Sequence, residues 1–509
     1  LDDVGISDVG ASGFDSTLVA TPHMDRLASE GVRFTRFYSG AALCAPSRYS
    51  VLTGNLVQRG EYFTGAWTLG RKLQVRAGQW TTGHLFRAAG YATAFVGKSH
   101  MGGELRAMKG ATCNRYACSR GEFDILRGIA TGRSDGRLGF DYNFETASGI
   151  QGPPYVYFED GKPVVVRRSA DDAARWVWRR ATAQPFVARK GACSTCKGFL
   201  SLDPDGDGVD GENYECTMAS YAYTGWDSTK AGEVYMQAAL DWLGRRADGG
   251  ERWYLHFSSQ AVHEPHTPDT FFGAPVRGTQ PTLHLDMVHE ADHQVGALMG
   301  WLEAHGQADS TLMLVTSDNG GLSDSQRTGH RASGPLNSYK GSRREGGVRV
   351  PLLARWPGGI PAAGVVCDKL WSQIDFFATF VELLGAESVP NAAAQGMDSV
   401  SMLPYFTSPD LACRSDAPSL RSHMFIHVGS PEAYDDRSHM AAYSDAGGKY
   451  DAMLGCEYPR CTSARTGARY VNLSSNPWEE DESGHEQAAQ TAPAAAELRT
   501  LLESTLRDI

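Results

Sequence analysis

Short apolar runs of strand length alternate with helical patterns along much of this 509-residue chain. The runs bounded by Gly, Pro or polar residues are 91–96, 253–258, 311–316 and 350–354. Residues 285–305 carry apolar side chains at helical spacing and stop before Gly306, which predicts an amphipathic helix. This alternation favours an α/β fold with a mostly parallel central sheet flanked by helices. Chemistry in such folds collects at the carboxyl ends of the strands, so polar residues at these ends are the candidate functional residues.

The composition excludes some classes of protein. A net charge of −11 argues against a nucleic-acid-binding protein, which would carry a basic stripe. No apolar run reaches 18 residues, so we expect no membrane span. Ten cysteines, several of them closely spaced, favour an oxidising compartment. We therefore expect a secreted, periplasmic or lysosomal protein, whose signal peptide would lie before Leu1.

Residues 44–54 read Cys-Ala-Pro-Ser-Arg-Tyr-Ser-Val-Leu-Thr-Gly. Cys44 stands where a loop meets a predicted helix, and Arg48 follows four residues later. A helix N-terminus and a nearby cation both favour an anion, so Cys44 is a candidate nucleophile. The alternative is a half-buried structural cysteine at a helix start.

This run resembles the signature of the type I sulfatase family, Cys-x-Pro-x-Arg followed by Leu-Thr-Gly, at every defining position. The resemblance implies that a formylglycine-generating enzyme converts Cys44 into an aldehyde, guided by Pro46 and Arg48. The hydrate of this formylglycine would attack sulfur, and Arg48 would hold the modified residue. An alkaline-phosphatase-like fold is implied as well.

Two pairs of residues with side-chain oxygen atoms lie at strand ends. Asp2 and Asp3 follow one expected strand end, and Asp318 and Asn319 follow the run 311–316. Three carboxylates and an amide oxygen suit Ca²⁺ or Mg²⁺ rather than zinc. Read separately, the pairs are a helix cap and a turn. The resemblance instead places them at the family's metal ligands, with calcium as the usual metal and the modified Cys44 completing its shell.

Two lysine-containing segments also resemble the family. Residues 97–102, Gly-Lys-Ser-His-Met-Gly, match Gly-Lys-Trp-His-Leu-Gly except at Ser99, and residues 339–351 match its Lys-Gly-x-x-x-Glu-Gly-Gly-x-Arg-x-Pro segment. The resemblance implies that Lys98 and Lys340 bind sulfate oxygens and stabilise the transition state. His100 would hydrogen-bond the hydrate and later accept the proton when sulfate is expelled. Without the resemblance, Lys98 and His100 would be interpreted as a solvated surface pair and residues 339–351 as a structural loop. Glu345 and Arg349 are expected to hold this loop together.

Residues 260–268, Gln-Ala-Val-His-Glu-Pro-His-Thr-Pro, follow the run 253–258. They resemble the family segment that carries the histidine beside the scissile ester. His263 is therefore our candidate general acid for the leaving alcohol, because imidazole holds a proton near neutral pH. His266 either lines the substrate pocket or caps a turn.

The resemblance also suggests a domain division. Residues 1–410 would form the catalytic domain, with its first strand truncated at the start of the chain. Residues 411–509 would form a small α+β domain with an antiparallel sheet starting at 424–428 and a helix at 494–506. The insert 193–216 contains the Asp-x-Asp-x-Asp-Gly opening of an EF-hand loop but has Tyr214 at the twelfth position. It is either an incomplete calcium loop or an acidic turn.

The expected function is hydrolysis of a sulfate ester to an alcohol and inorganic sulfate. The segment 260–265 is similar to the arylsulfatase B-like group, which acts on sulfated carbohydrates, so the partner is a small-molecule or carbohydrate sulfate ester. One alternative is a phosphonate monoester or phosphodiester hydrolase of the same superfamily. The other alternative is a catalytically silent binding homologue. This alternative is disfavoured because every expected catalytic position carries the catalytic residue type.

Overall fold

The computed structural model describes most of the chain. The residues outside the description are 15–17, 63–66, 68–71, 104–137, 153–154, 173–174, 181–185, 190–219, 224–225, 248–249, 324–328, 429–437, 458–459, 465–468, 474–492 and 509. The insert at 193–216 thus lies wholly outside the described residues. No helix among the described residues is long and apolar enough to cross a membrane.

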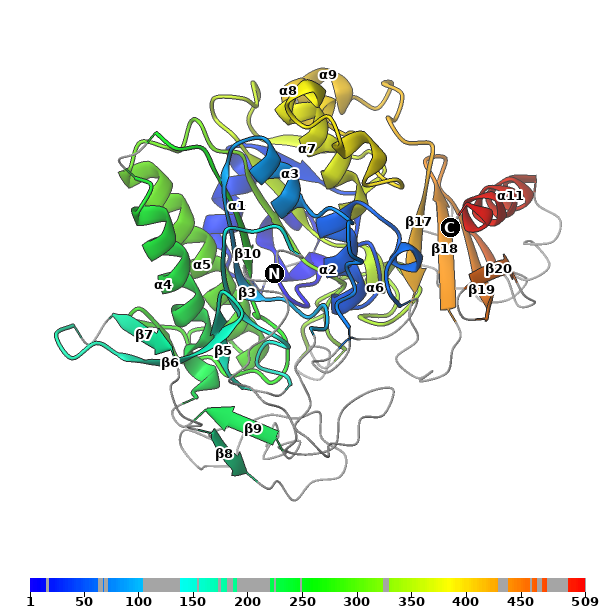
Figure 1. The fold of residues 1–509 in the computed structure, drawn as a ribbon. Coiled ribbons are helices and arrows are strands. Elements are labelled where there is room, and N and C mark those ends of the chain that lie inside the picture. Colours follow the sequence, from blue (N-terminus) through cyan, green and yellow to red (C-terminus); the bar gives the residue numbers. More distant parts are fainter. Residues whose placement is uncertain are drawn as a thin grey trace. The chain divides into compact units, whose positions relative to one another are not determined.

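The chain forms two compact units (Figure 1). The first unit comprises Leu1–Asp2 and Trp67–Trp301, and the second comprises Asp3–Ala66 and Leu302–Ile509. The chain therefore passes from one unit to the other at the peptide bond between two expected metal ligands, Asp2 and Asp3. The expected domain boundary near residue 410 stays a prediction.

A six-stranded sheet forms the framework of the first unit, in the order β10-β3-β4-β5-β6-β7. The strands are β10 (Trp253–Ser258), β3 (Ala92–Lys98), β4 (Tyr142–Thr146), β5 (Tyr157–Glu159), β6 (Lys162–Arg168) and β7 (Trp176–Arg180). The strands β10, β3 and β4 are parallel, and β4 to β7 are antiparallel. Two antiparallel two-stranded sheets accompany it, β8 (Phe186–Arg189) with β9 (Ser220–Tyr223) and β11 (Thr270–Phe271) with β12 (Ala274–Pro275).

Helices cover this sheet. They are α3 (Thr82–Ala88), α4 (Ala231–Gly244) and α5 (Leu283–Ala304), of which α5 enters the second unit at Leu302. Figure 1 shows α4 and α5 side by side, and both pack on the sheet through one apolar cluster. Its members are Ala92, Ala94, Tyr142, Trp242, Leu243, Trp253, Leu255, Leu298 and Trp301. Every residue of β3 is buried, including the polar Thr93 and Lys98, as expected for a strand covered on both faces.

The second unit contains a four-stranded sheet in the order β13-β14-β1-β15. Its strands are β13 (Met313–Thr316), β14 (Leu352–Arg355), β1 (Val32–Phe34) and β15 (Val365–Cys367), and only β1 and β15 run parallel. A parallel pair joins β2 (Phe37–Tyr38) and β16 (Trp371–Ser372). The helices are α1 (Pro22–Ser29), α2 (Cys44–Thr53), α6 (Glu345–Val348), α7 (Phe376–Leu384), α8 (Pro404–Thr407), α9 (Pro409–Ala412) and α11 (Pro493–Arg507).

The carboxyl-terminal part carries the expected antiparallel sheet. Its strands are β17 (His423–Val428), β18 (Ser438–Ser444), β19 (Gly448–Glu457), β20 (Arg460–Ala464) and β21 (Arg469–Asn472), with β21 paired to β19. Helix α11 packs on it (Figure 1). Met424, Ile426 and Tyr443 of this sheet share one buried cluster with Tyr38 and Val348. The sheet is therefore built into the core of the second unit.

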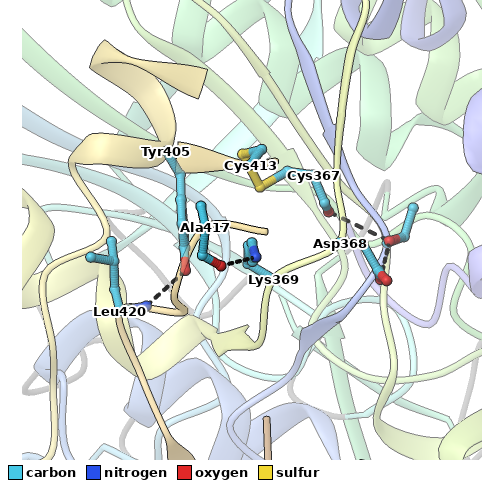
Figure 2. Close-up of a disulfide and its surroundings, with 8 residues drawn as sticks. Cys367, Asp368, Lys369, Tyr405, Cys413, Ala417 and Leu420 are labelled. Carbon is cyan, nitrogen blue, oxygen red and sulfur yellow. Dashed lines mark hydrogen bonds between the residues drawn. A yellow bond between two sulfur atoms is a disulfide. The ribbon is translucent and has the colours of Figure 1, made fainter. Parts of the chain in front are cut away.

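A disulfide joins Cys367, the last residue of β15, to Cys413, directly after α9 (Figure 2). Beside it, Lys369 Nζ donates to Ala417 O at 2.6 Å and Leu420 N donates to the Tyr405 hydroxyl at 3.0 Å. These bonds fasten the segment after α9 to the four-stranded sheet.

Candidate active site

The first unit contributes a buried lysine at the carboxyl end of β3. Lys98 is fully buried, and its Nζ donates to Asp2 Oδ2 at 2.6 Å and to Gln151 Oε1 at 2.5 Å. Asp2 is also fully buried, and its backbone N donates to Ala261 O at 2.9 Å. The close partners compensate the cost of burying both charges. The structure thus brings together Lys98 and Asp2, which are 96 residues apart.

His100 follows β3 in a backbone conformation that is unusual for histidine. Its φ is +49°, and it is buried. Its backbone N donates to Ala147 O at 2.9 Å, and Ser99 N donates to Thr146 O at 3.0 Å, so the loop after β4 holds the segment in place. Such left-handed residues cost about 1–3 kcal/mol each and cluster at functional sites.

His263 lies beyond the end of β10 with a defined ring orientation. Its Nδ1 lies 2.5 Å from Glu264 O. A carbonyl oxygen only accepts hydrogen bonds, so Nδ1 carries a hydrogen and Nε2 is the nitrogen that exchanges a proton. His266 is also buried, and its ring packs edge-on against His284 with 5.2 Å between centroids.

The second unit contributes Cys44 as the first residue of α2. Cys44 is buried, and Leu43 before it has the extended backbone of a helix cap. Arg48 lies one turn further along, also buried, and its guanidinium pairs with Asp318 Oδ2 at 2.7 Å. Gly54 ends the helix with φ +65°, which explains the glycine at the end of the Cys44 run.

Asp3 contacts residues from two separate segments of the second unit. Its backbone N donates to Asp318 Oδ1 at 3.0 Å, and its Oδ1 accepts from Asn319 Nδ2 at 2.8 Å. Its Oδ2 pairs with Lys340 Nζ at 2.6 Å. The φ of Asp3 is +61°, a left-handed backbone conformation that is unusual for a residue other than glycine.

The donors of the second unit fit a hard divalent cation. Asp3, Asp318 and Asn319 offer only oxygen atoms and are all buried. The Oδ1 of Asn319 is buried and has no hydrogen-bond partner among the described residues. A buried carbonyl oxygen of this kind is costly unless something binds it, and Ca²⁺ and Mg²⁺ prefer such ligands.

Supporting residues hold the backbone beside Asp3. Val4 N donates to Ser317 Oγ at 2.9 Å, and Gly5 N donates to Asp8 Oδ2 at 2.7 Å. The other oxygen of Asp8 lies 2.7 Å from His330 Nε2. A Cβ on Gly5 would lie 2.2 Å from Ala332 O, so this position requires glycine.

The segment around Lys340 is organised by Glu345, as expected. The Tyr38 hydroxyl donates to Glu345 Oε2 at 2.9 Å, and Arg349 Nε donates to Thr35 O at 2.7 Å. Burial, followed by the charge of Glu345, raises the pKa of Tyr38, so the phenol stays protonated.

Sequence reasoning missed several residues of this site. Gln151 contacts Lys98 directly. Ser317 and Asp8 accept from the backbone that follows Asp3, and His330 contacts Asp8. Asp8 stands close enough to Asp2 and Asp3 in sequence to have been suspected. The others carry no local signal, because their partners are distant in the chain.

A family model described as Sulfatase matches residues 1–386. Among curated relatives, the N-acetylgalactosamine-6-O-sulfatase of Bacteroides thetaiotaomicron is 27% identical over 79% of this chain and 75% of its own length. The steryl-sulfatase of Mus musculus is 32% identical over 79% of this chain and 64% of its own. The arylsulfatase D of Homo sapiens is 30% identical over 79% of this chain and 67% of its own length. The chain thus spans about two thirds to three quarters of these relatives.

Solved structures share the fold. One from work on glycosaminoglycan metabolism by Bacteroides thetaiotaomicron has a TM-score of 0.73 at 23% identity and covers 99% of this chain and 98% of its own. The phosphonate monoester hydrolase of Agrobacterium radiobacter has a TM-score of 0.52 at 15% identity, covering 99% and 93%. These likenesses confirm the predicted alkaline-phosphatase-like fold. The described sheets are mixed in direction, because antiparallel strands extend the parallel ones in both units.

Proposed function

This chain belongs to the sulfatase family, whose members are sulfuric ester hydrolases, and we propose that it releases inorganic sulfate from a carbohydrate sulfate ester with a formylglycine made from Cys44. The observation that carries the proposal is the position of Cys44. It opens a helix, is buried, and stands one turn before a guanidinium that is itself held by Asp318. A helix N-terminus and a fixed cation together favour an anionic nucleophile at this position.

A calcium ion is proposed as the metal, with magnesium as the alternative. Asp2, Asp3, Asp318, Asn319 and the modified Cys44 would hold it. The unpartnered Asn319 oxygen and the oxygen-only donor set support a hard cation. When bound, the metal supplies Lewis-acid polarisation of an oxygen, and the formylglycine supplies a hydrated aldehyde as nucleophile.

Lys98 and Lys340 are proposed to hold the sulfate oxygens. Each ammonium already lies 2.6 Å from a carboxylate oxygen of the consecutive residues Asp2 and Asp3. These carboxylates fix the direction of both ammonium groups, so positive charge is in place before the transition state forms. Arg48 would stabilise negative charge at the position of residue 44.

The two histidines are proposed to move protons. His263 has its Nδ1 occupied by Glu264 O, which leaves Nε2 to give a proton to the departing alcohol. His100 would accept a proton as sulfate leaves residue 44. Its backbone hydrogen bond to Ala147 O holds the main chain from which the imidazole projects.

The carbohydrate assignment draws on the relatives. Several are N-acetylgalactosamine-6-sulfatases, and one solved neighbour was crystallised with D-glucosamine-2-N,6-O-disulfate. The disulfide Cys367–Cys413 supports a secreted, periplasmic or lysosomal location, where such a bond persists. A formylglycine-generating enzyme would be the partner during maturation.

A substrate panel tests the proposal. Purified enzyme is assayed with sulfated saccharides, an aryl sulfate, a phosphodiester and a phosphonate monoester, and released sulfate and phosphorus products are quantified. We expect sulfate release from a saccharide to exceed every phosphorus reaction in kcat/KM. Faster cleavage of a phosphorus ester would favour the second candidate, a phosphonate monoester or phosphodiester hydrolase, which the shared fold keeps open.

A further inference from the structure

The loop that follows β4 places one amide side chain, Gln151, against the buried ammonium of Lys98. We propose that Gln151 positions Lys98 through its amide oxygen and donates from its amide nitrogen to a polar oxygen of the substrate beside the sulfate ester. This inference rests on the proposed function. It assigns a role in substrate specificity to a residue that belongs to none of the sequence motifs described above.

The loop is fixed to Lys98 and its neighbours at several points. Thr146 O and Ala147 O accept from Ser99 N and His100 N at 3.0 and 2.9 Å. Gly149 has φ +68°, and a Cβ built on it would lie 2.9 Å from Lys98 Cδ. The lysine stem therefore runs along the loop backbone, and Gln151 meets its end.

The direction of the Gln151 amide follows from hydrogen-bond chemistry. A lysine ammonium has three donors and no acceptor, so only Oε1 of the amide can face Lys98 Nζ. The two hydrogens on Nε2 then point away from the lysine. The side chain is half-buried, and no described residue accepts a hydrogen bond from Nε2. This donor is available to a ligand.

An amide also suits the charge balance of the site. Lys98 already faces the carboxylate of Asp2 at 2.6 Å. A second carboxylate at position 151 would cancel the positive charge that a sulfate group needs. The neutral amide holds the ammonium without cancelling its charge.

The free donor defines a class of substrate. Lys98 is proposed to hold a sulfate oxygen, so a donor on the adjacent amide lies next to the alcohol portion of the ester. A saccharide presents a hydroxyl or acetamido oxygen near its sulfate, whereas 4-nitrophenyl sulfate presents none there. Gln151 therefore favours saccharide sulfates over simple aryl sulfates.

Two substitutions separate the two roles. Gln151→Glu keeps an oxygen for Lys98 but cannot donate in its ionised form, and Gln151→Met keeps neither function. We measure kcat/KM on N-acetylgalactosamine 6-sulfate and on 4-nitrophenyl sulfate, together with inhibition by inorganic sulfate. One lost hydrogen bond corresponds to about a 5- to 10-fold loss. Gln237→Met in α4, whose amide bonds Asp241, is the matched control.

We expect Gln151→Glu to lose about 5- to 10-fold more on the saccharide than on the aryl sulfate. Gln151→Met should lose activity on both substrates and bind inorganic sulfate more weakly, while Gln237→Met matches the unsubstituted enzyme. Equal losses on the two substrates for both variants, or no loss, would overturn the inference while sulfate release continues. Absence of sulfate release from either substrate by the unsubstituted enzyme would instead overturn the proposed function.

Discussion

Two buried ion pairs lie among the candidate residues. Lys98 with Asp2 and Arg48 with Asp318 are held at 2.6 and 2.7 Å, and all four side chains are largely removed from water. Removing one member of such a pair strands the other charge in a medium of low dielectric constant. Stability and catalysis are therefore expected to depend on the same side chains.

Lys98→Met tests this coupling. The substitution keeps the length of the stem but leaves Asp2 without its cation, so we expect a loss of about 3–5 kcal/mol in the free energy of unfolding and loss of sulfate release. Denaturant unfolding and a sulfate assay measure the two effects. Arg499→Ala, which breaks the exposed pair with Glu503 on α11, should cost less than about 1 kcal/mol. A Lys98→Met protein as stable as the control would contradict the account of this pair.

Glu290 gives a residue-scale prediction about pH. Burial, followed by the charge of Glu233, raises its pKa from about 4.5 to about 8. Between these values the folded protein keeps a proton that the unfolded chain releases. The contribution of Glu290 to stability therefore falls as pH rises from about 4.5 to about 8, and is constant above that range.

Glu290→Gln removes this titration and retains an oxygen that can accept from Gln294. We expect the variant to gain stability over the unsubstituted protein between pH 5 and pH 8, with no further gain above it. Melting temperatures of both proteins across this range measure the difference. A constant difference at every pH would show that Glu290 does not carry the proton.

At the scale of elements, the sequence predicts the strands and the long helix, because burial of one or both faces leaves a local pattern of apolar residues. The expected runs appear as β3, β10, β13 and β14, and the expected helix as α5. The sequence does not predict whether neighbouring strands run parallel or antiparallel. The spacing of apolar residues indicates which side chains are buried, but not which strand lies alongside. The candidate residues Asp2, Lys98 and Asp318 were readable from motifs at strand ends. Gln151 could not be predicted from the sequence, because it contacts Lys98 only once the loop after β4 has folded.

The disulfide ties two elements together and carries its own prediction. It closes a loop across a sequence separation of 46 residues between β15 and the residue after α9. In the chain-entropy model such a link contributes about 4 kcal/mol. The double variant Cys367→Ser, Cys413→Ser should lose stability on this scale in denaturant unfolding, and a reducing agent should lower the stability of the parent by more than that of the variant. Equal stability of parent and variant would contradict a structural role for the bond.

At the scale of the whole molecule, metal binding is expected to stabilise the fold, because a ligand that binds only the folded state adds free energy of unfolding. At 100 times its dissociation constant, a metal adds about 2.7 kcal/mol. We expect EGTA to lower the melting temperature and Ca²⁺ to restore it. Asn319→Ala should respond less to both, because it lacks the amide oxygen. An effect of EDTA without one of EGTA would indicate Mg²⁺, and no effect of either would contradict a structural metal.

The family match, the helix that starts at Cys44 and the buried cation at Arg48 all converge on one residue. We propose that this residue works as formylglycine and not as a thiol. Mass analysis of the peptide that carries Cys44, from enzyme that releases sulfate, tests the claim most directly. We predict the mass of formylglycine at position 44, with activity rising in proportion to its fraction. A fully active preparation in which residue 44 is unmodified cysteine would contradict the account.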